Sequence, residues 1–180
     1  MSENNLTEAA ENIKKIIRNV PDFPKKGILF KDITPLLADH AAFRETVRLM
    51  AEPYRGRGIT KVLGIEARGF LLAAPIALEL RAGLVPVRKK GKLPYTTVSA
   101  TYELEYGQDT LQIHEDSLGK NEKVLIVDDV LATGGTASAV CELVNKLGAQ
   151  VAGITMLIEL EFLKGRNKLA GRDVHSLIKY

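Results

Sequence analysis

Apolar residues recur along the first third of the chain at spacings of three and four, which is the period of an amphipathic helix. This pattern predicts one helix over residues 6–18 and a second over residues 39–56. Thr7 and Asp39 stand near the starts of these stretches and are candidate N-caps. Between the two helices, residues 21–35 mix prolines and other turn residues with a short apolar run, so we expect an irregular arm there.

From residue 61 onward, short apolar runs alternate with helical stretches, which is typical of a mostly parallel sheet flanked by helices. The runs that we expect as strands are 61–65, 84–88, 123–127 and 151–158. The helices expected between them are 69–81, closed by Gly83, and 135–147, closed by Gly148. Two more β-prone runs predict a hairpin or mobile flap, and these are 96–104 and 109–114. The fold class is therefore α/β, with a central mostly parallel sheet.

Composition is that of an ordinary globular protein, with 46% apolar and 26% charged residues, so disordered and fibrous classes are disfavoured. A length of 180 residues suits one domain with a hydrophobic core, which we expect to span residues 1–180. Basic residues exceed acidic ones by 25 to 22. The resulting net charge of +3 is too small to indicate nucleic-acid binding.

Cys141 is the only cysteine, so no intramolecular disulfide can form. It stands among apolar residues of a predicted helix and is expected to pack as a small apolar side chain. The first residues show neither the basic nor the apolar region of a signal peptide, and no apolar run reaches membrane-spanning length. We therefore expect a soluble cytoplasmic protein with no membrane partner.

The candidate chemistry lies in the string VLIVDDVLATGGT, residues 124–136. Its apolar strand brings Asp128 and Asp129 to the carboxyl end of the sheet, where open α/β sheets bind ligands. The two carboxylates can accept hydrogen bonds from a pair of ribose hydroxyls, or hold a magnesium ion. The next residues open a helix whose free N–H groups, glycines and hydroxyls fit a phosphate. These residues are Ala132, Thr133, Gly134, Gly135 and Thr136.

A Thr-Gly-Gly-Thr run can also simply form a tight turn and cap a helix. The two adjacent carboxylates weigh against this alternative, because carboxylates at a buried strand end are costly without a partner. Other phosphate motifs fit less well. The chain has no G-x-x-x-x-G-K-[ST], and Lys61 stands where a G-x-G-x-x-G from Gly56 needs its third glycine. Nucleoside triphosphate and dinucleotide binding are thus disfavoured.

The string at 124–136 resembles the phosphoribosyl pyrophosphate motif of the type I phosphoribosyltransferases. Four more segments extend the likeness from about Pro21 to Tyr180, and they are PDFPKKGILFKDITP, GIEARGF, VRKKGKLP and YELEYG. The set resembles the adenine phosphoribosyltransferase family. This resemblance implies the type I phosphoribosyltransferase fold, with residues 1–35 as N-terminal helix and base-binding arm and residues 95–114 as flap hairpin. It also implies a homodimer in which magnesium-bound phosphoribosyl pyrophosphate and adenine give AMP and pyrophosphate.

Glu66, Ala67 and Arg68 stand between a predicted strand and a predicted helix. Backbone N–H groups on such a loop, together with the forked Arg68 guanidinium, are suited to a pyrophosphate. The resemblance implies that role for the loop. The alternative is that Arg68 forms a surface salt bridge.

Arg88, Lys89, Lys90 and Lys92 form the densest basic run in the chain. Such a run by itself is most often a solvated face, or sometimes a nucleic-acid patch. No aromatic residues are interleaved with it, and it follows an expected core strand. The resemblance points to Arg88 and Lys92, and also to Lys89, as cations for the departing pyrophosphate.

Glu105 and Tyr106 stand at the tip of the expected flap, which could close over the reactants and exclude water. The resemblance implies that the Glu105 carboxyl transfers a proton on the N7 and N9 side of the purine. An ordinary exposed glutamate in a hairpin is the alternative.

For the base, Phe30 offers a ring for stacking, while the backbone of Leu29 and Lys31 can read a purine edge. Main-chain hydrogen bonds could distinguish an exocyclic amine from an oxo group. The alternative is that Phe30 packs the N-terminal arm onto the core. Family members often carry Arg where Lys31 stands, which leaves only the backbone role for that position.

Two rival functions remain open at this point. One is a transferase for another purine base, which would need different donors and acceptors in the N-terminal arm. The other is a regulatory protein of the same fold that binds RNA or DNA, which would need a wide basic face. The three histidines fall in unrelated elements, so we expect no zinc site, and they are His40, His114 and His175.

Overall fold

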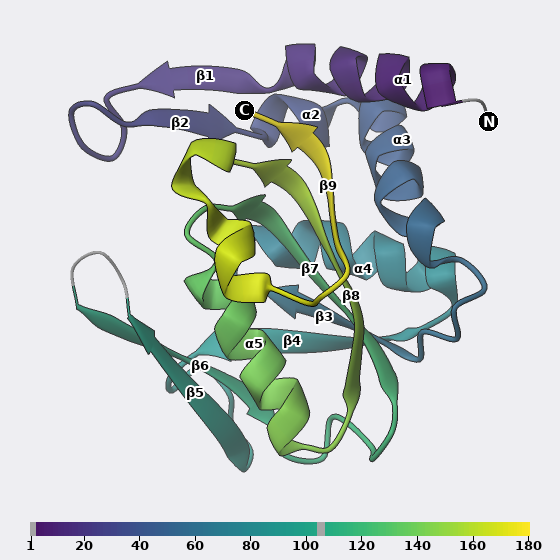
Figure 1. Ribbon diagram of the computed structural model, residues 1–180, viewed down its shortest axis with the longest axis vertical. Coiled ribbons are helices and arrows are strands. Elements are labelled where there is room, and N and C mark those ends of the chain that lie inside the picture. The colour runs from purple at the N-terminus through teal and green to yellow at the C-terminus, as the bar shows by residue number, and fades with distance from the viewer. Residues whose placement is uncertain (1–2, 104–106) are drawn as a thin grey trace. The chain divides into compact units, whose positions relative to one another are not determined.

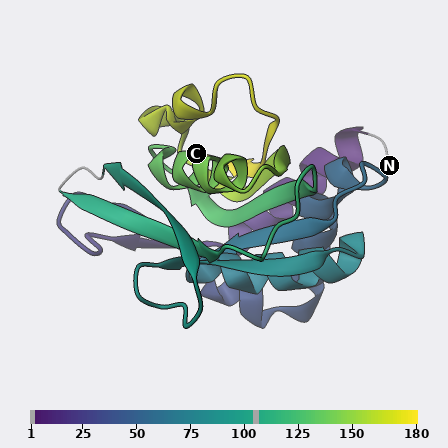
Figure 2. The same cartoon turned by 90° about the horizontal axis from the view of Figure 1, so that it is seen from below.

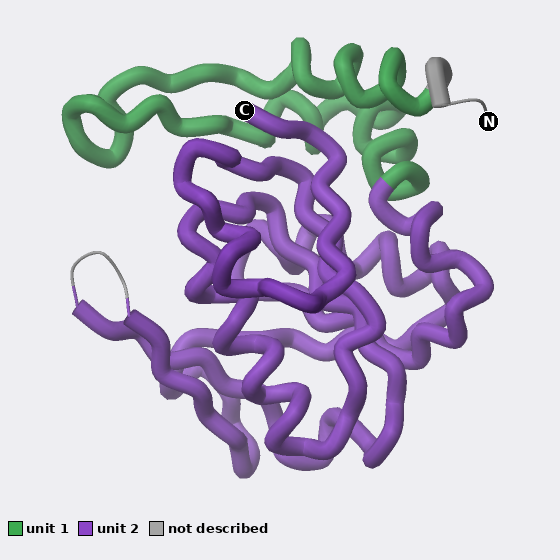
Figure 3. Tube along the Cα trace, in the orientation of Figure 1, with its two compact units in different colours: residues 1–49 green, residues 50–180 purple. Residues whose placement is uncertain are grey.

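The computed structural model describes residues 3–103 and 107–180 (Figure 1). The chain groups into two units, residues 1–49 and residues 50–180 (Figure 3). The expected α/β class and the mostly parallel central sheet are confirmed. Within the described residues, no helix is both long enough and apolar enough to cross a membrane.

The first unit holds two helices and a two-stranded antiparallel sheet. Its elements are α1 (Glu3–Ile16), β1 (Arg18–Pro21), β2 (Leu29–Asp32), α2 (Thr34–Ala38) and the start of α3 (His40–Ala51). The hairpin replaces the irregular arm that we expected, with Arg18 opposite Asp32 and Pro21 opposite Leu29. Strands of four residues beside several prolines are too short to show a period in the sequence.

Two cap predictions in this part of the chain have different outcomes. Asp39 accepts a hydrogen bond on Oδ1 from the N–H of Ala42, at 2.9 Å, so its N-cap role is confirmed. Thr7 lies inside α1, which begins at Glu3, so the prediction that it caps this helix is wrong. The helix also ends at Ile16, two residues before the predicted end.

The second unit is built on a seven-stranded sheet with strand order β5-β6-β4-β3-β7-β8-β9. Neighbours from β4 to β9 pair in parallel, whereas β4, β6 and β5 pair antiparallel at one end. The strands are β3 (Lys61–Ile65), β4 (Gly83–Lys89), β5 (Thr97–Glu103), β6 (Gln108–His114), β7 (Lys123–Leu131), β8 (Gln150–Glu159) and β9 (Val174–Lys179). The two β-prone runs are thus confirmed as the antiparallel pair β5 and β6. The expected flap tip, residues 104–106, lies outside the described residues, and the flap role stays a prediction.

Two helices cover the opposite faces of this sheet (Figure 2). The helix α4 (Arg68–Leu80) connects β3 to β4, and α5 (Gly135–Lys146) connects β7 to β8. The two connections step along the sheet in opposite directions, and right-handed crossovers then place their helices on opposite faces. Apolar side chains of α5 and the sheet form a continuous core, in which Cys141 is only 2% exposed. Its expected apolar packing is confirmed.

Three expectations about element ends in this unit are corrected. Gly83 begins β4 and does not cap α4, because Arg81 adopts the left-handed conformation (φ 55°) that closes the helix. Strand β7 continues to Leu131, so Asp128 and Asp129 lie within it and not after its end. The last strand, β9, and the 3-10 segments before it, η2 (Glu161–Leu163) and η3 (Gly165–Leu169), were not expected from the sequence.

Candidate active site

Polar residues gather where the carboxyl ends of β3 and β7 lie side by side. The chain leaves β3 toward β4 and leaves β7 toward β8, so the order of the strands reverses between these two neighbours. In open α/β sheets, a crevice opens at such a reversal because the two following helices diverge to opposite faces. The topology alone therefore marks this edge of the sheet as the place for a ligand.

Two neighbouring carboxylates lie near the end of β7. Asp128 accepts a hydrogen bond on Oδ1 from the N–H of Asp129, at 2.9 Å. Desolvation by the surrounding protein raises the pKa of Asp128 well above its usual value, and the charge of Asp129 raises it further. Burial also raises the pKa of Asp129, which is 5% exposed, although the positive charge of Arg68 offsets part of that rise. The pair is therefore costly to ionise in this structure.

Arg68 forms an ion pair with Asp129, with Nε 2.9 Å from Oδ2. The contact lacks hydrogen-bond geometry, since Asp129 Oδ2 is a buried oxygen without a hydrogen-bond partner among the described residues. Arg68 begins α4, so this pair ties the first residue of that helix to β7. The alternative of an exposed surface salt bridge does not describe this pair, because the Asp129 side chain is buried. The expected role of Arg68 toward a pyrophosphate stays a prediction.

Gly69 allows the start of α4 to approach the two aspartates closely. A Cβ on Gly69 would stand 2.8 Å from Asp128 Oδ1 and 3.0 Å from the carbonyl oxygen of Val127. Both distances are shorter than carbon and oxygen atoms tolerate. Only glycine therefore lets α4 and β7 meet here, and sequence reasoning did not single out this residue.

Residues 132–134 form a loop after β7, and Gly135 and Thr136 begin α5. Gly134 has a φ of 78°, in the left-handed region that favours glycine, and no side chain caps the N-terminus of α5. The first amides of the helix therefore keep their N–H groups for an anion. A cavity of about 60 Å³ is lined by this loop, Asp128 and Met156.

The segment η3 supports this loop from the other side. A Cβ on Gly134 would overlap the carbonyl oxygen of Gly165, and a Cβ on Gly165 would overlap that of Ala132. The two backbones thus pack directly against each other. Neither Gly165 nor its segment was a candidate from the sequence, because the contact joins residues that are distant along the chain.

The basic run that begins at the end of β4 contacts two acidic residues. Arg88 Nε lies 3.3 Å from Glu66 Oε2, and the N–H of Lys89 donates to the same oxygen at 3.0 Å. Burial would raise the pKa of Glu66, yet these two donors hold it below its usual value. Lys89 Nζ lies 3.1 Å from Asp109 Oδ2. For Lys92, the carbonyl oxygen accepts a hydrogen bond from Arg88 at 3.1 Å.

Glu66 and Ala67 form the loop between β3 and α4, as expected, and the peptide bond that joins them is cis. The backbone N–H of Glu66 donates to the carbonyl oxygen of Val87 at 3.0 Å. That N–H group is thus engaged with β4, whereas the expectation assigned the N–H groups of this loop to a ligand.

Tyr102 of β5 lies against the start of α5, within residues 132–136, which we call the phosphate loop after its expected role. Its ring would lie 3.3 Å from a Cβ on Gly135, and the Thr136 side chain offsets part of the rise that burial causes in the pKa of the Tyr102 hydroxyl. The same hydroxyl lies 3.5 Å from Asp109 Oδ2. Burial raises the pKa of Tyr102, so the hydroxyl stays protonated. Tyr102 belongs to a β-prone run that was recognised in the sequence. The pattern of that run could not show that Tyr102 contacts Gly135.

The roles assigned to the remaining predicted site residues stay predictions. Glu105 and Tyr106 lie outside the described residues. Leu29, Phe30 and Lys31 belong to β2 in the first unit. There, the Phe30 ring meets the Phe23 ring edge to face at 5.1 Å, and Lys31 Nζ donates to Asn19 Oδ1 at 2.7 Å.

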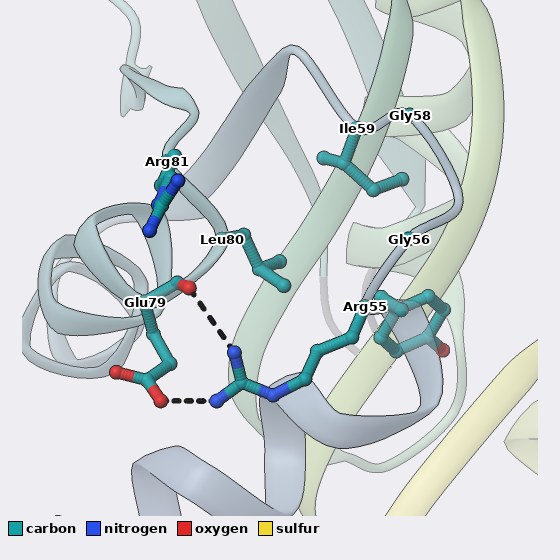
Figure 4. A pocket seen from close by; sticks show the side chains of 8 residues that line it. Arg55, Gly56, Gly58, Ile59, Glu79, Leu80 and Arg81 are labelled. Atoms are coloured by element: carbon teal, nitrogen blue, oxygen red, sulfur yellow. Dashed lines mark hydrogen bonds and ion pairs between the residues drawn. The ribbon is translucent and has the colours of Figure 1, made fainter.

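A larger hollow of about 480 Å³ lies at the far end of α4 (Figure 4). Its lining includes Arg55, which pairs with the Glu79 carboxylate and donates to the Glu79 carbonyl oxygen. The 13 residues of α4 separate Arg68 from this hollow by about 20 Å, at 1.5 Å per residue. The hollow is therefore distinct from the cluster around Asp128.

The family model described as "Phosphoribosyl transferase domain" matches residues 32–176 of the chain. A relative from Geobacter metallireducens, named adenine phosphoribosyltransferase, is 57% identical over 170 residues, which cover 94% of this chain and 99% of the relative. These matches span the aspartate pair, the phosphate loop and the basic run.

Solved structures agree with this assignment. The adenine phosphoribosyltransferase of Thermoanaerobacter pseudethanolicus superposes with a TM-score of 0.92 at 54% identity, over 95% of this chain and 99% of that one. The Saccharomyces cerevisiae enzyme, complexed with an imino-altritol bisphosphate and adenine, superposes with a TM-score of 0.87 at 39% identity, over 94% and 98% of the two chains. Because the likeness covers nearly the whole sequence and the whole fold, the chain belongs to the adenine phosphoribosyltransferase family.

Proposed function

We propose that this chain transfers the phosphoribosyl group of phosphoribosyl pyrophosphate to adenine, giving AMP and pyrophosphate in purine salvage. The observation that carries the proposal is the pairing of two buried carboxylates with an uncapped helix start at the reversal point of the sheet. A diol needs acceptors and a phosphate needs donors, and this edge of the sheet offers both within one stretch of chain. The enzyme is proposed to act in the cytoplasm.

In this proposal, Asp128 and Asp129 accept hydrogen bonds from the ribose hydroxyls. The N–H groups of residues 132–136 and the hydroxyls of Thr133 and Thr136 bind the 5′-phosphate. The high cost of ionising the two carboxylates in the free protein supports this assignment, since diol hydroxyls would supply the donors that the pair lacks. Catalysis then comes mainly from orientation of the ribose and placement of charge around it.

The pyrophosphate is proposed to bind the loop of Glu66, Ala67 and Arg68 together with the cations of Arg88, Lys89 and Lys92. Arg68 would exchange its pairing with Asp129 for the incoming pyrophosphate, because its side chain is 37% exposed and can turn outward. Once the Arg68 side chain turns outward, the Asp129 carboxylate would be free to accept hydrogen bonds from the ribose hydroxyls. The basic run supplies positive charge to the departing group as the bond at ribose C1 breaks.

Magnesium is proposed to reach the site with the pyrophosphate. The described residues contain no cluster of three or more side chains that could hold a metal ion by themselves. Asp129 Oδ2 makes an ion pair but no hydrogen bond in the described residues, and it would suit an ion that takes most of its ligands from the substrate and water. When bound, the ion would neutralise part of the charge on the pyrophosphate.

The base is proposed to bind the N-terminal arm, residues 1–35, where Phe30 stacks on adenine and the backbone of Leu29 and Lys31 reads its edge. The flap, residues 95–114, is proposed to close over the reactants with Tyr106 at its tip and Glu105 as the proton-transfer group. Both segments would then belong to one catalytic domain of residues 1–180. Adenine recognition by main-chain groups would reject bases that carry an oxo group at the same position.

A spectrophotometric assay with phosphoribosyl pyrophosphate, magnesium and each of adenine, hypoxanthine, guanine and xanthine tests the function. We expect turnover with adenine and little with the oxopurines. Turnover of an oxopurine at the rate of adenine would contradict the specificity. No turnover with any base would favour a regulatory protein that binds RNA or DNA through the same fold.

The assignment of the ribose site is tested by the double variant Asp128→Asn with Asp129→Asn. Amides can still accept hydrogen bonds but carry no charge, so we expect a loss of activity of about 10²-fold or more with the fold intact. Circular dichroism checks the fold, and initial rates check the activity. Near-normal rates in a folded double variant would remove the two aspartates from the site.

A further inference from the structure

The segment η3 forms an unexpected wall beside the phosphate loop. Backbone atoms of Gly165 stand so close to the loop that a Cβ at Gly165 would overlap the carbonyl oxygen of Ala132 and reach the N atom of Gly134 at 3.0 Å. This packing leaves no room for a side chain at Gly134 or at Gly165. Residues that follow Gly165 are therefore held at a constant distance from the first turn of α5.

A buried ion pair anchors this segment to the sheet. Arg166 binds Glu159 through two parallel contacts, Nε to Oε1 and Nη2 to Oε2, both 2.7 Å long. It also donates to the carbonyl oxygen of Val174 at 2.9 Å, and to Ser176 Oγ at 3.3 Å. Glu159 is only 3% exposed. A forked pair with this geometry fixes the orientation of η3 relative to β8 and β9.

Lys168 projects from the anchored segment toward the start of α5. Its Nζ lies 3.9 Å from the point where a Cβ on Gly135 would stand, and Gly135 is the first residue of that helix. The side chain is exposed, and no acidic partner is recorded for it in the described part of the chain. An uncompensated ammonium thus stands beside the helix start whose N–H groups are also positive.

We propose that Lys168 is a further phosphate-binding residue, which adds a cation to the 5′-phosphate held by residues 132–136. Two positive features placed side by side repel each other in the free protein, and a phosphate dianion between them removes that repulsion. Lys is suited to this role because its ammonium acts as a compact point charge with three donors. This inference rests on the proposed function, because it assumes that the loop binds a phosphate.

The expected effect is specific to the 5′-phosphate. Removing the charge should weaken the binding of ribose 5-phosphate by about tenfold, which corresponds to the loss of one hydrogen bond to a charged group. Binding of pyrophosphate should change by less than about twofold, because that group is assigned to the loop at 66–68 and the run at 88–92. The salt dependence of ribose 5-phosphate binding should also become shallower.

The experiment uses the full chain and compares Lys168→Met, Lys168→Gln and Lys168→Arg by titration calorimetry with ribose 5-phosphate and with pyrophosphate. The matched control is Lys123→Met, which removes an exposed charge at the opposite end of β7. We expect both charge-free variants to lose affinity for ribose 5-phosphate, Lys168→Arg to recover most of it, and the control to bind both ligands normally.

Unchanged ribose 5-phosphate affinity in the charge-free variants would overturn the inference. So would an equal loss for both ligands, since that result indicates a general disturbance of the fold. If one charge-free variant does not fold, the other decides. Turnover of adenine by the unmodified chain is measured in parallel. Turnover together with unchanged Lys168 variants would leave the proposed function standing without this residue, whereas absent turnover and absent ribose 5-phosphate binding would contradict the function itself.

Discussion

The backbone of β7 holds Asp128 and Asp129 in buried surroundings, which disfavour the charged form of both carboxylates. Desolvation raises the pKa of Asp128 first of all, and the neighbouring Asp129 adds to it. Arg68 offers the pair a single compensating charge, and one oxygen of Asp129 still lacks a hydrogen-bond partner in the described chain. The burial of this pair therefore lowers the stability of the free protein, which agrees with its proposed role as acceptors for a ligand.

The first prediction concerns the stability of Asp128→Asn. The folded pKa of Asp128 lies above its unfolded value of 3.8, so the folded state disfavours the charged form. The resulting penalty is fully present above the folded pKa and disappears as the pH falls toward 3.8. We therefore expect Asp128→Asn to raise the free energy of unfolding at pH 7 by about 1–3 kcal/mol. Urea denaturation at several pH values measures this change.

The gain in Asp128→Asn should shrink as the pH is lowered, because protonation relieves the same penalty in the unmodified protein. Asp116→Asn serves as the matched control, since Asp116 is an exposed aspartate away from β7. We expect no gain from it. A decrease in stability for Asp128→Asn at pH 7 would show that the carboxylate is compensated in the free protein.

The second prediction concerns the proposed proton transfer by Glu105. Replacement by Gln keeps the size of the side chain and removes its ability to exchange a proton. We expect Glu105→Gln to lower kcat by about 10²-fold, the usual scale for lost general acid–base catalysis, with little change in KM for phosphoribosyl pyrophosphate. Steady-state kinetics measure both constants. Glu115→Gln, at an exposed position after β6, is the control, and equal kcat values for the two variants would show that Glu105 is incidental.

Among the elements, the phosphate loop depends on two neighbours that lie far from it in sequence. Tyr102 of β5 contacts it from the flap side, and η3 contacts it through Gly165. The position of η3 is in turn fixed by the ion pair of Arg166 with Glu159. The loop is thus held between a strand and a short 3-10 segment, and neither is adjacent to it along the chain.

The third prediction follows from the burial of Glu159. Replacing Arg166 with Ala leaves a buried carboxylate without its cation. We expect a loss of about 3 kcal/mol, the low end of the range for a broken buried pair, because Arg166 itself is partly exposed. Urea denaturation measures the loss. The control is Lys179→Ala, which removes an exposed partner of Glu161 and should cost less than about 1 kcal/mol. A similar loss of unfolding free energy in both variants would show that the pair with buried Glu159 contributes no more to stability than an exposed pair.

On the scale of the whole molecule, the opposite directions of the two crossovers decide where chemistry can occur. They leave α4 on the face opposite α5, and such a reversal of strand order is where open α/β sheets bind ligands. The outer side of α4 carries Leu71 and Leu78, which are 50% and 81% exposed. Seven residues apart on a helix, these two side chains share one face. We propose that the homodimer implied by the family resemblance forms through this apolar face.

The fourth prediction concerns that homodimer. A charge placed on an apolar interface must be desolvated when the two subunits meet, so we expect Leu78→Glu to convert the dimer to a monomer. Light scattering after size exclusion measures the mass. Phe162→Glu is the control, because Phe162 is a similarly exposed apolar residue on η2, and it should leave the mass unchanged. A dimeric Leu78→Glu variant would place the interface elsewhere.

Periodicity along the chain was enough to predict most of the fold. Strand β3 was predicted with its bounds, the β5–β6 hairpin was expected as such, and α5 was found within one residue of its ends. These signals are local, because an apolar run or a repeating spacing reflects the solvent on each side of one element. The acidic pair followed by Thr-Gly-Gly-Thr is also a local signal, and the phosphate site that it predicts stays a prediction.

Contacts between distant residues were decided only by the tertiary structure. No spacing indicates that Arg68 pairs with Asp129, that Gly165 packs on Gly134, or that Lys168 stands beside Gly135. Local sequence also could not show the hairpin of β1 and β2, whose strands are too short for a period. The sequence therefore determined which chemical groups the site contains. The tertiary structure determined which of these groups contact each other, because the sheet brings together segments that are distant along the chain.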